Sequence, residues 1–425
     1  MIFSCYNKNG EIVKKVIIGL ILVVIIGGTF LYIREIEYQS NQVEKLEQVK
    51  KEKEEKLKEI KNNYNKYVIV NKDTNLYTYN ENRYQKSGKV VKDITFELEE
   101  LDENSEYYKI KNLNKYIYYK DVSRTENLVV ETIYKNYVPF NLNIITKNAK
   151  FYKNDKVIFE LNDEEEFKVL GKSDTLYYIE LNNMFLSVKK EDVVKEYESH
   201  NTDLESATDI AVLNYHFFYD KENGEVCNQI ICHEKQFFKE QLDYLKNNNF
   251  FTTDMESFSM FLDGIIKLPK KTVLLTIDDG GQGVKEVAIP MLTEYQMNAT
   301  VFLVTSWYNP SEYENEYIEC HSHTNNMHND GVCPMEQGGG LTCLSEEEIK
   351  NDLQASRNIL NGSTAIAYPF YEYNDYAIEQ LKNNGFELAF IDGGKKASVG
   401  CNKFLIPRYV MSTNWNINDF ISAVN

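Results

Sequence analysis

The chain opens with one long apolar run, and no later segment has this pattern. Residues 16–33 (VIIGLILVVIIGGTFLYI) carry no charged side chain. At a rise of about 1.5 Å per residue, such a run just spans a hydrocarbon core of about 30 Å. Lys8, Lys14 and Lys15 precede the run, and this positive bias predicts a cytoplasmic N-terminus with the rest of the chain outside the cell. The run is long for a signal peptide and lacks a small-residue cleavage site after it. We therefore predict a cytoplasmic tail, 1–15, followed by one uncleaved transmembrane helix.

Residues 34–65 are polar and dense in Glu and Lys at helical spacing. Opposite charges four residues apart stabilise a helix, so this segment predicts a helical stalk of about 45 Å. Two interpretations stay open: a solvated single helix, or a weak coiled coil through which the chain self-associates. The coiled coil would use a 3,4-spaced seam that is apolar at five of seven positions: Val43, Leu46, Lys50, Lys53, Leu57, Ile60 and Tyr64.

Between residues 66 and 200, short runs of Tyr, Val, Ile and Phe alternate with polar residues, and Asn, Asp and Gly mark the turns. This pattern is typical of strands and hairpins. A weak internal repeat accompanies it. Three short sequences recur after 70 to 75 residues: Asn75-Leu76-Tyr77 as Lys150-Phe151-Tyr152, Tyr107-Tyr108 as Tyr177-Tyr178, and Lys120-Asp121-Val122 as Glu191-Asp192-Val193.

The repeat predicts two small β-barrels, at 66–126 and 143–198, which resemble paired bacterial SH3-type modules of cell-wall proteins. Exposed tyrosines would let these modules bind a wall or glycan. A spacer without a ligand is the equal alternative.

From residue 207 to the end, apolar strands alternate with amphipathic helices, which predicts an α/β domain with parallel strands in a barrel or open sheet. Helices are predicted at Glu234–Asn247, after a capping box at Ser345, and from Asn374 to Asn383 before Gly385. The expected strands are Ile210–Asn214, Thr272–Ile277, Ala299–Thr305, Tyr317–Cys320, Ala365–Tyr368, Glu387–Ile391 and Phe404–Ile406.

Two of these strands end in residues that carry chemistry. Asp278 and Asp279 follow the strand Thr272–Ile277 directly. Adjacent carboxylates repel each other, and such a pair usually persists because one of them binds a cation or a proton. In parallel barrels the active site lies at the carboxyl ends of the strands. This pair is therefore a candidate site, and an ordinary exposed turn is the alternative.

Three of the six histidines fall within eight residues, at His321, His323 and His328. Imidazole is the commonest transition-metal ligand, and two imidazoles with one carboxylate leave positions open for water and substrate. His323 and His328 are five residues apart, which suits a loop better than one face of a helix.

Together these segments resemble the motifs of the polysaccharide deacetylases, the NodB-like domain of carbohydrate esterase family 4. The likeness covers residues 207–425. The five-residue His spacing is similar to that of the poly-N-acetylglucosamine deacetylases. The matching segments are Thr276-Ile277-Asp278-Asp279-Gly280, His323 to His328, Ala367-Tyr368-Pro369-Phe370-Tyr371, Ile391-Asp392-Gly393 and Ile406-Pro407-Arg408.

The resemblance implies a deacetylase-type (β/α) barrel and a divalent metal, with zinc as the expected ion. Its ligands would be Asp279, His323 and His328, and Asp278 would be the general base. Pro369, Phe370 and Tyr371 would contact the substrate, and the backbone N–H of Tyr371 would stabilise the oxyanion. The substrate would be an N-acetylated polysaccharide of the cell surface, either peptidoglycan or poly-N-acetylglucosamine.

The chain departs from the family pattern at two places. The third motif usually carries an Arg where this chain has Ala367, and we expect Arg408 to orient Asp278 instead. The general-acid His of the last motif is missing, since the chain has no His after Arg408. His216, just past the strand Ile210–Asn214, is the candidate replacement, and a packed core imidazole is its alternative. An O-acetyl esterase and a weakly active glycan-binding protein stay open as rival functions.

Six cysteines follow the predicted membrane helix, which suits up to three disulfides outside the cell, with fifteen pairings open. Cys333 and Cys343 flank three glycines and would pin a loop, while Cys320 beside the histidines could instead supply a thiolate ligand. The six are Cys227, Cys232, Cys320, Cys333, Cys343 and Cys401.

Charge narrows the function classes. With 47 Lys and Arg against 65 Asp and Glu, the net charge is 47 − 65 = −18. Nucleic-acid binders need a basic face, so we expect no nucleic-acid partner.

Overall fold

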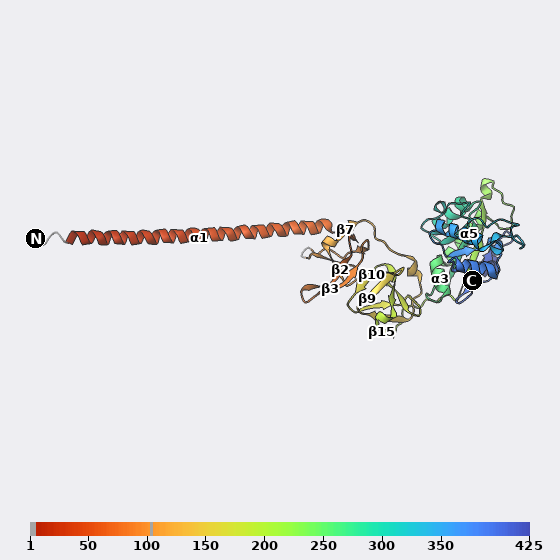
Figure 1. Cartoon of the computed structure of the whole chain (residues 1–425), viewed down its shortest axis with the longest axis horizontal. Helices are drawn as coiled ribbons and strands as arrows, with labels where there is room; N and C mark the ends of the chain where they lie inside the picture. Colours follow the sequence, from red (N-terminus) through yellow and green to blue (C-terminus); the bar gives the residue numbers. More distant parts are fainter. Residues whose placement is uncertain (1–5, 103–104) are drawn as a thin grey trace. The chain divides into compact units, whose positions relative to one another are not determined.

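The computed structural model describes residues 6–102 and 105–425, except for most side chains before residue 34. The chain forms two compact units, Met1–Leu128 and Val129–Asn425, which are described separately (Figure 1).

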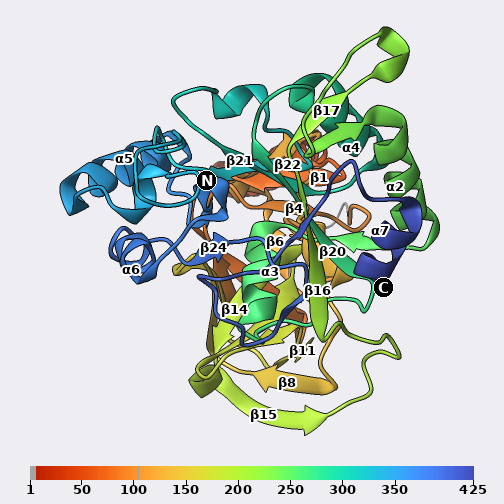
Figure 2. The same cartoon turned by 90° about the vertical axis from the view of Figure 1, so that its right-hand side faces the viewer.

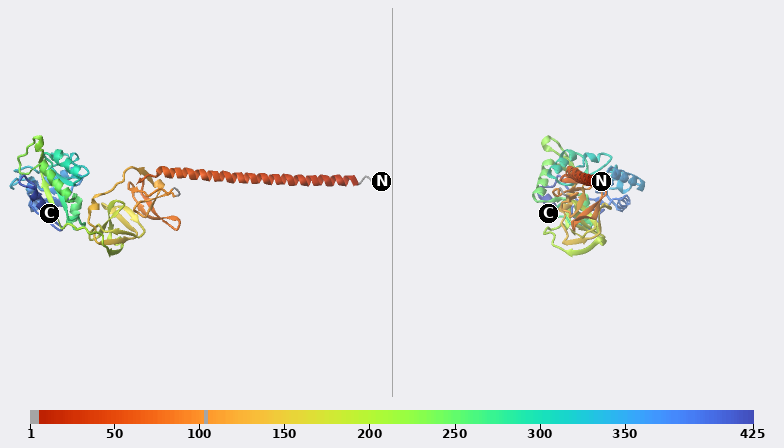
Figure 3. Two further views of the ribbon diagram at one scale, coloured as in Figure 1. Left: turned by 180° about the vertical axis from the view of Figure 1, so that it is seen from behind. Right: turned by 90° about the vertical axis from the view of Figure 1, so that its left-hand side faces the viewer.

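The first unit begins with α1 (Tyr6–Asn63), which runs as one unbroken helix (Figure 3). The predicted membrane segment, 16–33, lies on this helix, but most of its side chains lie outside the described residues. Among the residues that the structure describes, no helix is both long and apolar enough to span a membrane. The predicted stalk, 34–65, is helical up to Asn63.

The end of α1 packs on the first β module. Ile60 is only 4% exposed, and the Tyr108 hydroxyl donates to its carbonyl oxygen at 2.6 Å. The first two positions of the predicted seam are exposed to solvent within this unit, with Val43 53% and Leu46 68% exposed. The last seam positions are therefore used inside the unit, and self-association through the stalk stays a prediction.

The first β module is built from two small antiparallel sheets, in the orders β4-β1-β7 and β3-β2-β6-β5. The 3-10 turn η1 (Tyr119–Asp121) leads into the last strand. The strands are β1 (Tyr67–Val70), β2 (Thr74–Asn80), β3 (Arg83–Val90), β4 (Thr95–Glu97), β5 (Tyr107–Lys109), β6 (Tyr116–Tyr118) and β7 (Val122–Thr125).

The second β module repeats this plan, with the orders β11-β8-β15 and β12-β13-β14-β9-β10 and the turn η3 (Lys190–Asp192) before its last strand. A β-bulge lies opposite Leu76/Tyr77 in one module and opposite Phe151/Tyr152 in the other. The strands are β8 (Leu142–Thr146), β9 (Ala149–Lys153), β10 (Lys156–Leu161), β11 (Glu165–Lys168), β12 (Gly171–Lys172), β13 (Leu176–Leu181), β14 (Met184–Lys189) and β15 (Val193–Glu198). The predicted repeat is present, and the likeness to SH3-type modules stays a prediction.

One part of the predicted repeat was out of register. Tyr108 lies opposite Ile117, and Tyr177 lies opposite Val188. Since Ile117 pairs with Leu76 and Val188 with Phe151, Tyr108 corresponds to Tyr177, not to Tyr178. Side chains alternate between the faces of a strand, so a one-residue slip exchanges buried and outer positions.

The C-terminal part of the second unit is a curled α/β sheet covered by helices (Figure 2). Its parallel strands follow the order β24-β23-β22-β21-β20-β16, and β25 (Ala397–Ser398) pairs antiparallel with β16. The parallel strands are β16 (Asp209–Tyr215), β20 (Thr272–Asp279), β21 (Ala299–Leu303), β22 (Ile318–Ser322), β23 (Ala365–Ala367) and β24 (Leu388–Phe390). Because this order ends at β24 and β25 among the described strands, the predicted barrel is a partial one.

The predicted helices are present, with Glu234, Ser345 and Asn374 as their N-caps. The predicted strand Phe404–Ile406 was wrong, since only Ile406 makes an isolated bridge to Phe390, and β26 (Tyr409–Val410) follows it. The helices are α2 (Lys235–Asn247), α3 (Met255–Leu262), α4 (Ile289–Tyr295), α5 (Glu346–Ile359), α6 (Asp375–Asn383) and α7 (Ile417–Val424). The pattern did not reveal α3, α4 or α7.

The second β module shares a core with the α/β sheet. In the segment just before this module, the Tyr137 hydroxyl lies 2.6 Å from Ser257 Oγ, at the start of α3. The N–H of Val138 donates to the Lys267 carbonyl, and the N–H of Lys172 to the Ile265 carbonyl, both at 2.8 Å. These bonds satisfy backbone groups of both parts at once, so the two form one folded body.

Candidate metal centre

Asp279 occupies a strained turn at the carboxyl end of β20. Its φ is +68°, in the left-handed region that non-glycine residues rarely adopt. Gly280 follows with φ +78°, and a Cβ there would lie 2.3 Å from Leu303. Such strain is held at functional sites by the surrounding structure. Here the turn directs the Asp279 carboxylate toward the histidines after β22.

Asp279, His323 and His328 form the predicted ligand cluster. One ligand atom from each lies within 4.8 Å of the other two, and both imidazole Nε2 atoms lie 3.3 Å from Asp279 Oδ1. That oxygen is buried and has no hydrogen-bond partner, which is unusual unless an ion completes it. His323 Nδ1 bonds to the Ala367 carbonyl oxygen at 2.9 Å. This bond fixes the tautomer and leaves Nε2 directed at the centre.

The electrostatics suit a divalent cation. Burial alone would raise the pKa of Asp279, but His323, His216 and His328 hold that pKa far below its ordinary value. Burial, with the neighbouring His323, lowers the pKa of His328 to about 4. Asp279 and His328 therefore have the protonation states that metal ligands need at neutral pH. Burial would lower the pKa of His323, but Asp279 and Asp278 raise it, so a bound cation would displace a proton from that imidazole.

Asp278 forms a buried ion pair with Arg408. Both guanidinium nitrogens, Nη1 and Nη2, lie 2.7 Å from the carboxylate oxygens, and neither side chain is more than 1% exposed. Burial would raise the pKa of Asp278, but Arg408 and the nearby histidines hold it below its ordinary value. Arg408 thus occupies the place expected for it and fixes the plane of the carboxylate.

His216 lies beside Asp278, with its Nε2 3.9 Å from Asp278 Oδ2. The Tyr371 hydroxyl lies 3.1 Å from the same nitrogen and donates to Asn214 Oδ1 at 2.7 Å. Because the hydroxyl gives its one proton to Asn214, the Nε2 of His216 carries a proton in this arrangement. Burial lowers the pKa of His216, against the pull of Asp278 and Asp279. Because its Nε2 lies near Asp278, the imidazole of His216 faces the site.

The comparisons with known proteins bear on this geometry. Residues 266–389 match the family model described as polysaccharide deacetylase. The chain contains a polysaccharide deacetylase domain.

Two curated relatives share the name poly-beta-1,6-N-acetyl-D-glucosamine N-deacetylase. The protein of Staphylococcus epidermidis is 26% identical over 42% of this chain and 68% of its own length. The protein of Staphylococcus aureus MRSA252 is 24% identical over 47% of this chain and 74% of its own length. Among solved structures, the Streptococcus pyogenes deacetylase PplD in complex with acetate is 20% identical over 52% of this chain and all of its own chain, with a TM-score of 0.42.

The rim of the deacetylase domain's site is formed by the loop Pro369–Tyr371, in which Phe370 and Tyr371 have φ +57° and +60°. The Phe370 ring lies 4.3 Å from the His328 ring. The expected oxyanion donor was wrong, because the Tyr371 N–H already donates to the Tyr368 carbonyl at 3.0 Å. Tyr371 instead contributes its hydroxyl, which lies between Asn214 and His216, and the motif did not reveal this role.

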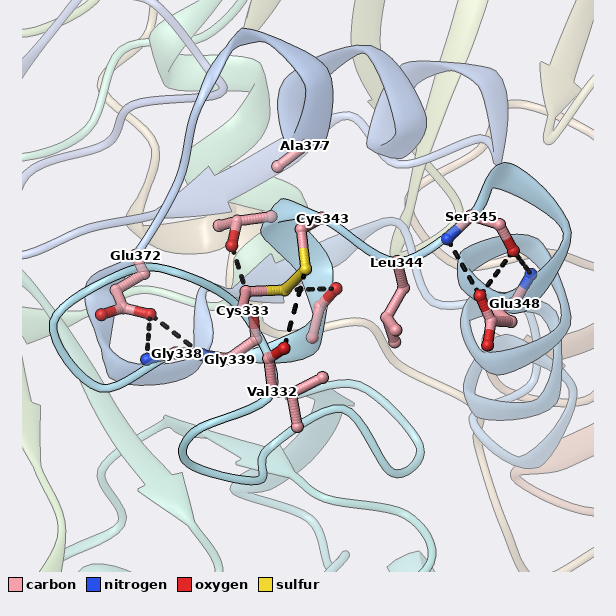
Figure 4. The surroundings of a disulfide bond; sticks show 12 residues. Val332, Cys333, Gly338, Gly339, Cys343, Leu344, Ser345, Glu348, Glu372 and Ala377 are labelled. Carbon is pink, nitrogen blue, oxygen red and sulfur yellow. Dashed lines mark hydrogen bonds between the residues drawn. A yellow bond between two sulfur atoms is a disulfide. The ribbon is translucent and has the colours of Figure 1, made fainter.

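A disulfide between Cys333 and Cys343 closes the loop behind this rim (Figure 4). The Glu372 carboxylate accepts from the N–H groups of Gly338 and Gly339, both at 3.0 Å. A Cβ on Gly339 would lie 3.1 Å from the Phe370 ring, so the pinned loop supports the aromatic side chain above the ligands.

The other cysteines and histidines of the deacetylase domain lie apart from the centre. Cys227 pairs with Cys232, while Cys320 and Cys401 stay free, so the third disulfide is not formed. Burial raises the pKa of the Cys320 thiol, which argues against a thiolate ligand. His321 bonds to Ser363 Oγ at 2.8 Å and is not part of the ligand cluster.

Sequence reasoning missed Asn214, which receives the Tyr371 hydroxyl proton. It is the last residue of a predicted strand, and its position at that strand's carboxyl end was the available signal.

Proposed function

We propose that the protein is a metal-dependent N-deacetylase that hydrolyses the acetamide groups of N-acetylglucosamine units in a cell-surface glycan. The observation that carries the proposal is the buried Asp278–Arg408 pair beside the three-ligand cluster. The names of the staphylococcal relatives favour poly-N-acetylglucosamine as the polymer. Peptidoglycan is the alternative, which the two β modules would suit.

Asp279, His323 and His328 would hold the divalent ion, for which zinc is our candidate. The donor set fits, since it combines an unpartnered carboxylate oxygen with two imidazole nitrogens. When bound, the ion would supply Lewis acidity that polarises the acetamide carbonyl and lowers the pKa of a bound water.

Asp278 would accept the proton of the attacking water. Arg408 keeps its carboxylate ionised and fixes its orientation, so the group is ready to accept a proton at neutral pH. A buried carboxylate without that partner would become protonated and lose this ability. The pair argues against one of the two reasons for a merely binding protein, the missing Arg at position 367, while the other reason, the displaced general acid, stays open.

His216 would protonate the leaving amine as the acetyl C–N bond breaks. Burial lowers the pKa of its imidazole, so the ring is neutral at rest. It would act after gaining the proton that Asp278, 3.9 Å away, takes from the attacking water, and it would then give that proton to the amine. Tyr371 and Asn214 hold the ring in place through the hydroxyl bridge. Pro369, Phe370 and Tyr371 would form the wall against which the sugar ring lies.

We also propose that the catalytic domain works outside the cell, held to the membrane by residues 16–33 and lifted from it by the stalk. The basis is the charge bias around the apolar run and the disulfides Cys227–Cys232 and Cys333–Cys343, which suit an oxidising compartment.

Acetate release from purified poly-N-acetylglucosamine and from wall glycan tests the proposal. We expect release that stops with a chelator, returns with zinc, and is lost in Asp279→Ala. The exposed Asp203→Ala is the matched control and should keep full activity. Faster release from an O-acetylated than from an N-acetylated polymer would contradict the proposal in favour of an esterase. No release by a zinc-loaded protein would favour a binding protein.

A further inference from the structure

The first β module carries a cavity of about 580 Å³ whose lining is rich in tyrosine. It lies over the sheet β3-β2-β6-β5 and includes the segment from Glu99 to Asp102 and the residue after α1. Six tyrosines line it: Tyr64, Tyr79, Tyr84, Tyr107, Tyr108 and Tyr116. Nothing in the proposed reaction uses this cavity.

The rings at the centre of the cavity are held in fixed positions. Tyr84 and Tyr107 stack with their centroids 4.0 Å apart, and Tyr116 meets Tyr84 edge-on at 5.2 Å. The Tyr84 hydroxyl lies 2.6 Å from Ser105 Oγ, and Tyr79 beside it is 47% exposed. Rigid, half-exposed rings give a large contact area at a low cost in entropy. Their flat faces suit the C–H face of a sugar ring.

The rim of the same cavity is acidic. Its lining includes the carboxylates of Glu99, Glu100, Asp102 and Glu106, against the single ammonium of Lys109. Glu99 is paired with Lys109 at 3.0 Å, and Glu106 with Lys56. Glu100 is exposed. The exposed Glu100 carboxylate favours a cation and gives a neutral sugar no advantage.

The second β module shows that this surface is not a requirement of the fold. By strand register, Tyr77 corresponds to Tyr152, Tyr107 to Leu176 and Tyr116 to Ser187. In the second module the equivalent face meets α3 and Ile265 of the deacetylase domain across a second cavity. The fold therefore tolerates non-aromatic residues where the first module has its stacked rings.

From these observations we propose that the tyrosine cavity binds a glycan that carries free amino groups, a polymer with glucosamine units. The rings would stack on the sugars, and the rim carboxylates would attract the ammonium groups. This inference rests on the proposed function, because removal of an acetyl group is the step that turns a neutral sugar unit into a cationic one. The module would then hold the product of the reaction.

Binding can be measured apart from turnover by calorimetry on the full chain carrying Asp279→Ala. The probes are β-1,6-linked hexamers of glucosamine and of N-acetylglucosamine. We expect at least tenfold tighter binding of the glucosamine hexamer, weakening as salt rises, because salt screens the charges on the rim. Tyr107→Ala should lose at least tenfold in affinity. Glu100→Gln, which changes no packing, should reduce the preference for the glucosamine hexamer about threefold.

Two matched controls, Tyr197→Ala in the second module and Glu126→Gln outside the cavity, should leave binding unchanged. Equal affinity for both hexamers, or full affinity in both Tyr107→Ala and Glu100→Gln, would overturn the inference. Failure here is distinct from failure of the proposed function. If the wild type releases acetate but the Asp279→Ala chain binds both hexamers alike, only the inference is lost, whereas absence of acetate release by the wild type rejects the reaction itself.

Discussion

The two β modules share strand order, a bulge and a 3-10 turn, but they use the same face in different ways. In the second module this face carries Tyr152, Leu176 and Ser187 and meets α3 of the deacetylase domain. In the first module the face carries stacked tyrosines around a cavity. The matching buried positions, such as Tyr108 and Tyr177, stay 3% and 4% exposed. Buried positions thus define the repeat, while the outer face is free to acquire a function.

This difference predicts that the second module is part of the catalytic body, whereas the tyrosine face of the first serves a ligand. The four changes below test that division, beginning with the one of largest expected effect.

Arg408→Met should separate the two functions most sharply. It leaves Asp278 buried without its partner, which we expect to cost about 3–5 kcal/mol of unfolding free energy. Acetate release should fall at least a hundredfold, because Asp278 loses its charge and its orientation. Urea denaturation and acetate assays measure both effects. Binding of the glucosamine hexamer should not change, and its loss would show that the two sites are not independent.

Tyr137→Ala tests whether the segment just before the second module ties that module to the catalytic body. Tyr137 is 5% exposed and bonds to Ser257, so truncation should cost about 3–5 kcal/mol. Tyr137→Phe, which removes only the hydroxyl, should cost about 1 kcal/mol. The melting temperature of the deacetylase domain should fall more in Tyr137→Ala than in Tyr137→Phe, in line with these losses of unfolding free energy. An unchanged melting temperature for both variants would show that this segment does not tie the module to the catalytic body.

Asp254→Asn tests the same junction through its pH dependence. Burial, with the nearby Glu319, raises the pKa of Asp254 to about 6. The folded state therefore binds the proton more tightly than the unfolded chain, so this group's contribution is most favourable below pH 4 and is lost as the pH rises through 6. Asn caps a helix as well as Asp. We expect the variant to be more stable by about 1–2 kcal/mol at pH 7.5 and equal to wild type at pH 4.

Urea titrations at the two pH values give this comparison. A difference of the same size at both would contradict the raised pKa. Ser259→Ala, one turn further along α3, is a control that carries no charge.

Tyr107→Ala should have the smallest effect on stability. The residue lies on the outer face of β5, so we expect a loss of about 1 kcal/mol or less. Tyr108→Ala, one residue further on, removes a side chain that is 3% exposed and should cost about 3–5 kcal/mol. Circular dichroism during thermal unfolding compares the two variants. Equal losses would show that the register correction is wrong.

The sequence alone predicted six of the seven expected α/β strands and placed the Asp and His residues at their carboxyl ends, because both depend on local patterns. Asp278, Asp279, His323 and His328 lie in short motifs next to apolar strands. The register of Tyr107 and Tyr108 was missed because two adjacent tyrosines look alike in sequence, while the pleat separates them. The hydroxyl bridge from Tyr371 to Asn214 joins residues 157 positions apart, and no local pattern encodes such a contact.

The pairing of the cysteines was also not predictable from local pattern, because it depends on the distances between them in the folded chain. The pairs that formed are separated by 5 and 10 residues. The remaining two, Cys320 and Cys401, are far apart in sequence and stay free. The docking face of the second module was equally hidden, since a partner surface is chosen by packing and not by periodicity.

The junction between α1 and the first module has a mechanical consequence. The Tyr108 hydroxyl is bonded to the Ile60 carbonyl, and the Tyr64 hydroxyl to the Glu99 carbonyl at 3.0 Å. Tyr64, Tyr108 and Glu99 also line the tyrosine cavity. A pulling force along the helix would therefore bear in part on the wall of the cavity, so tension on the stalk and occupancy of the cavity would act on shared bonds.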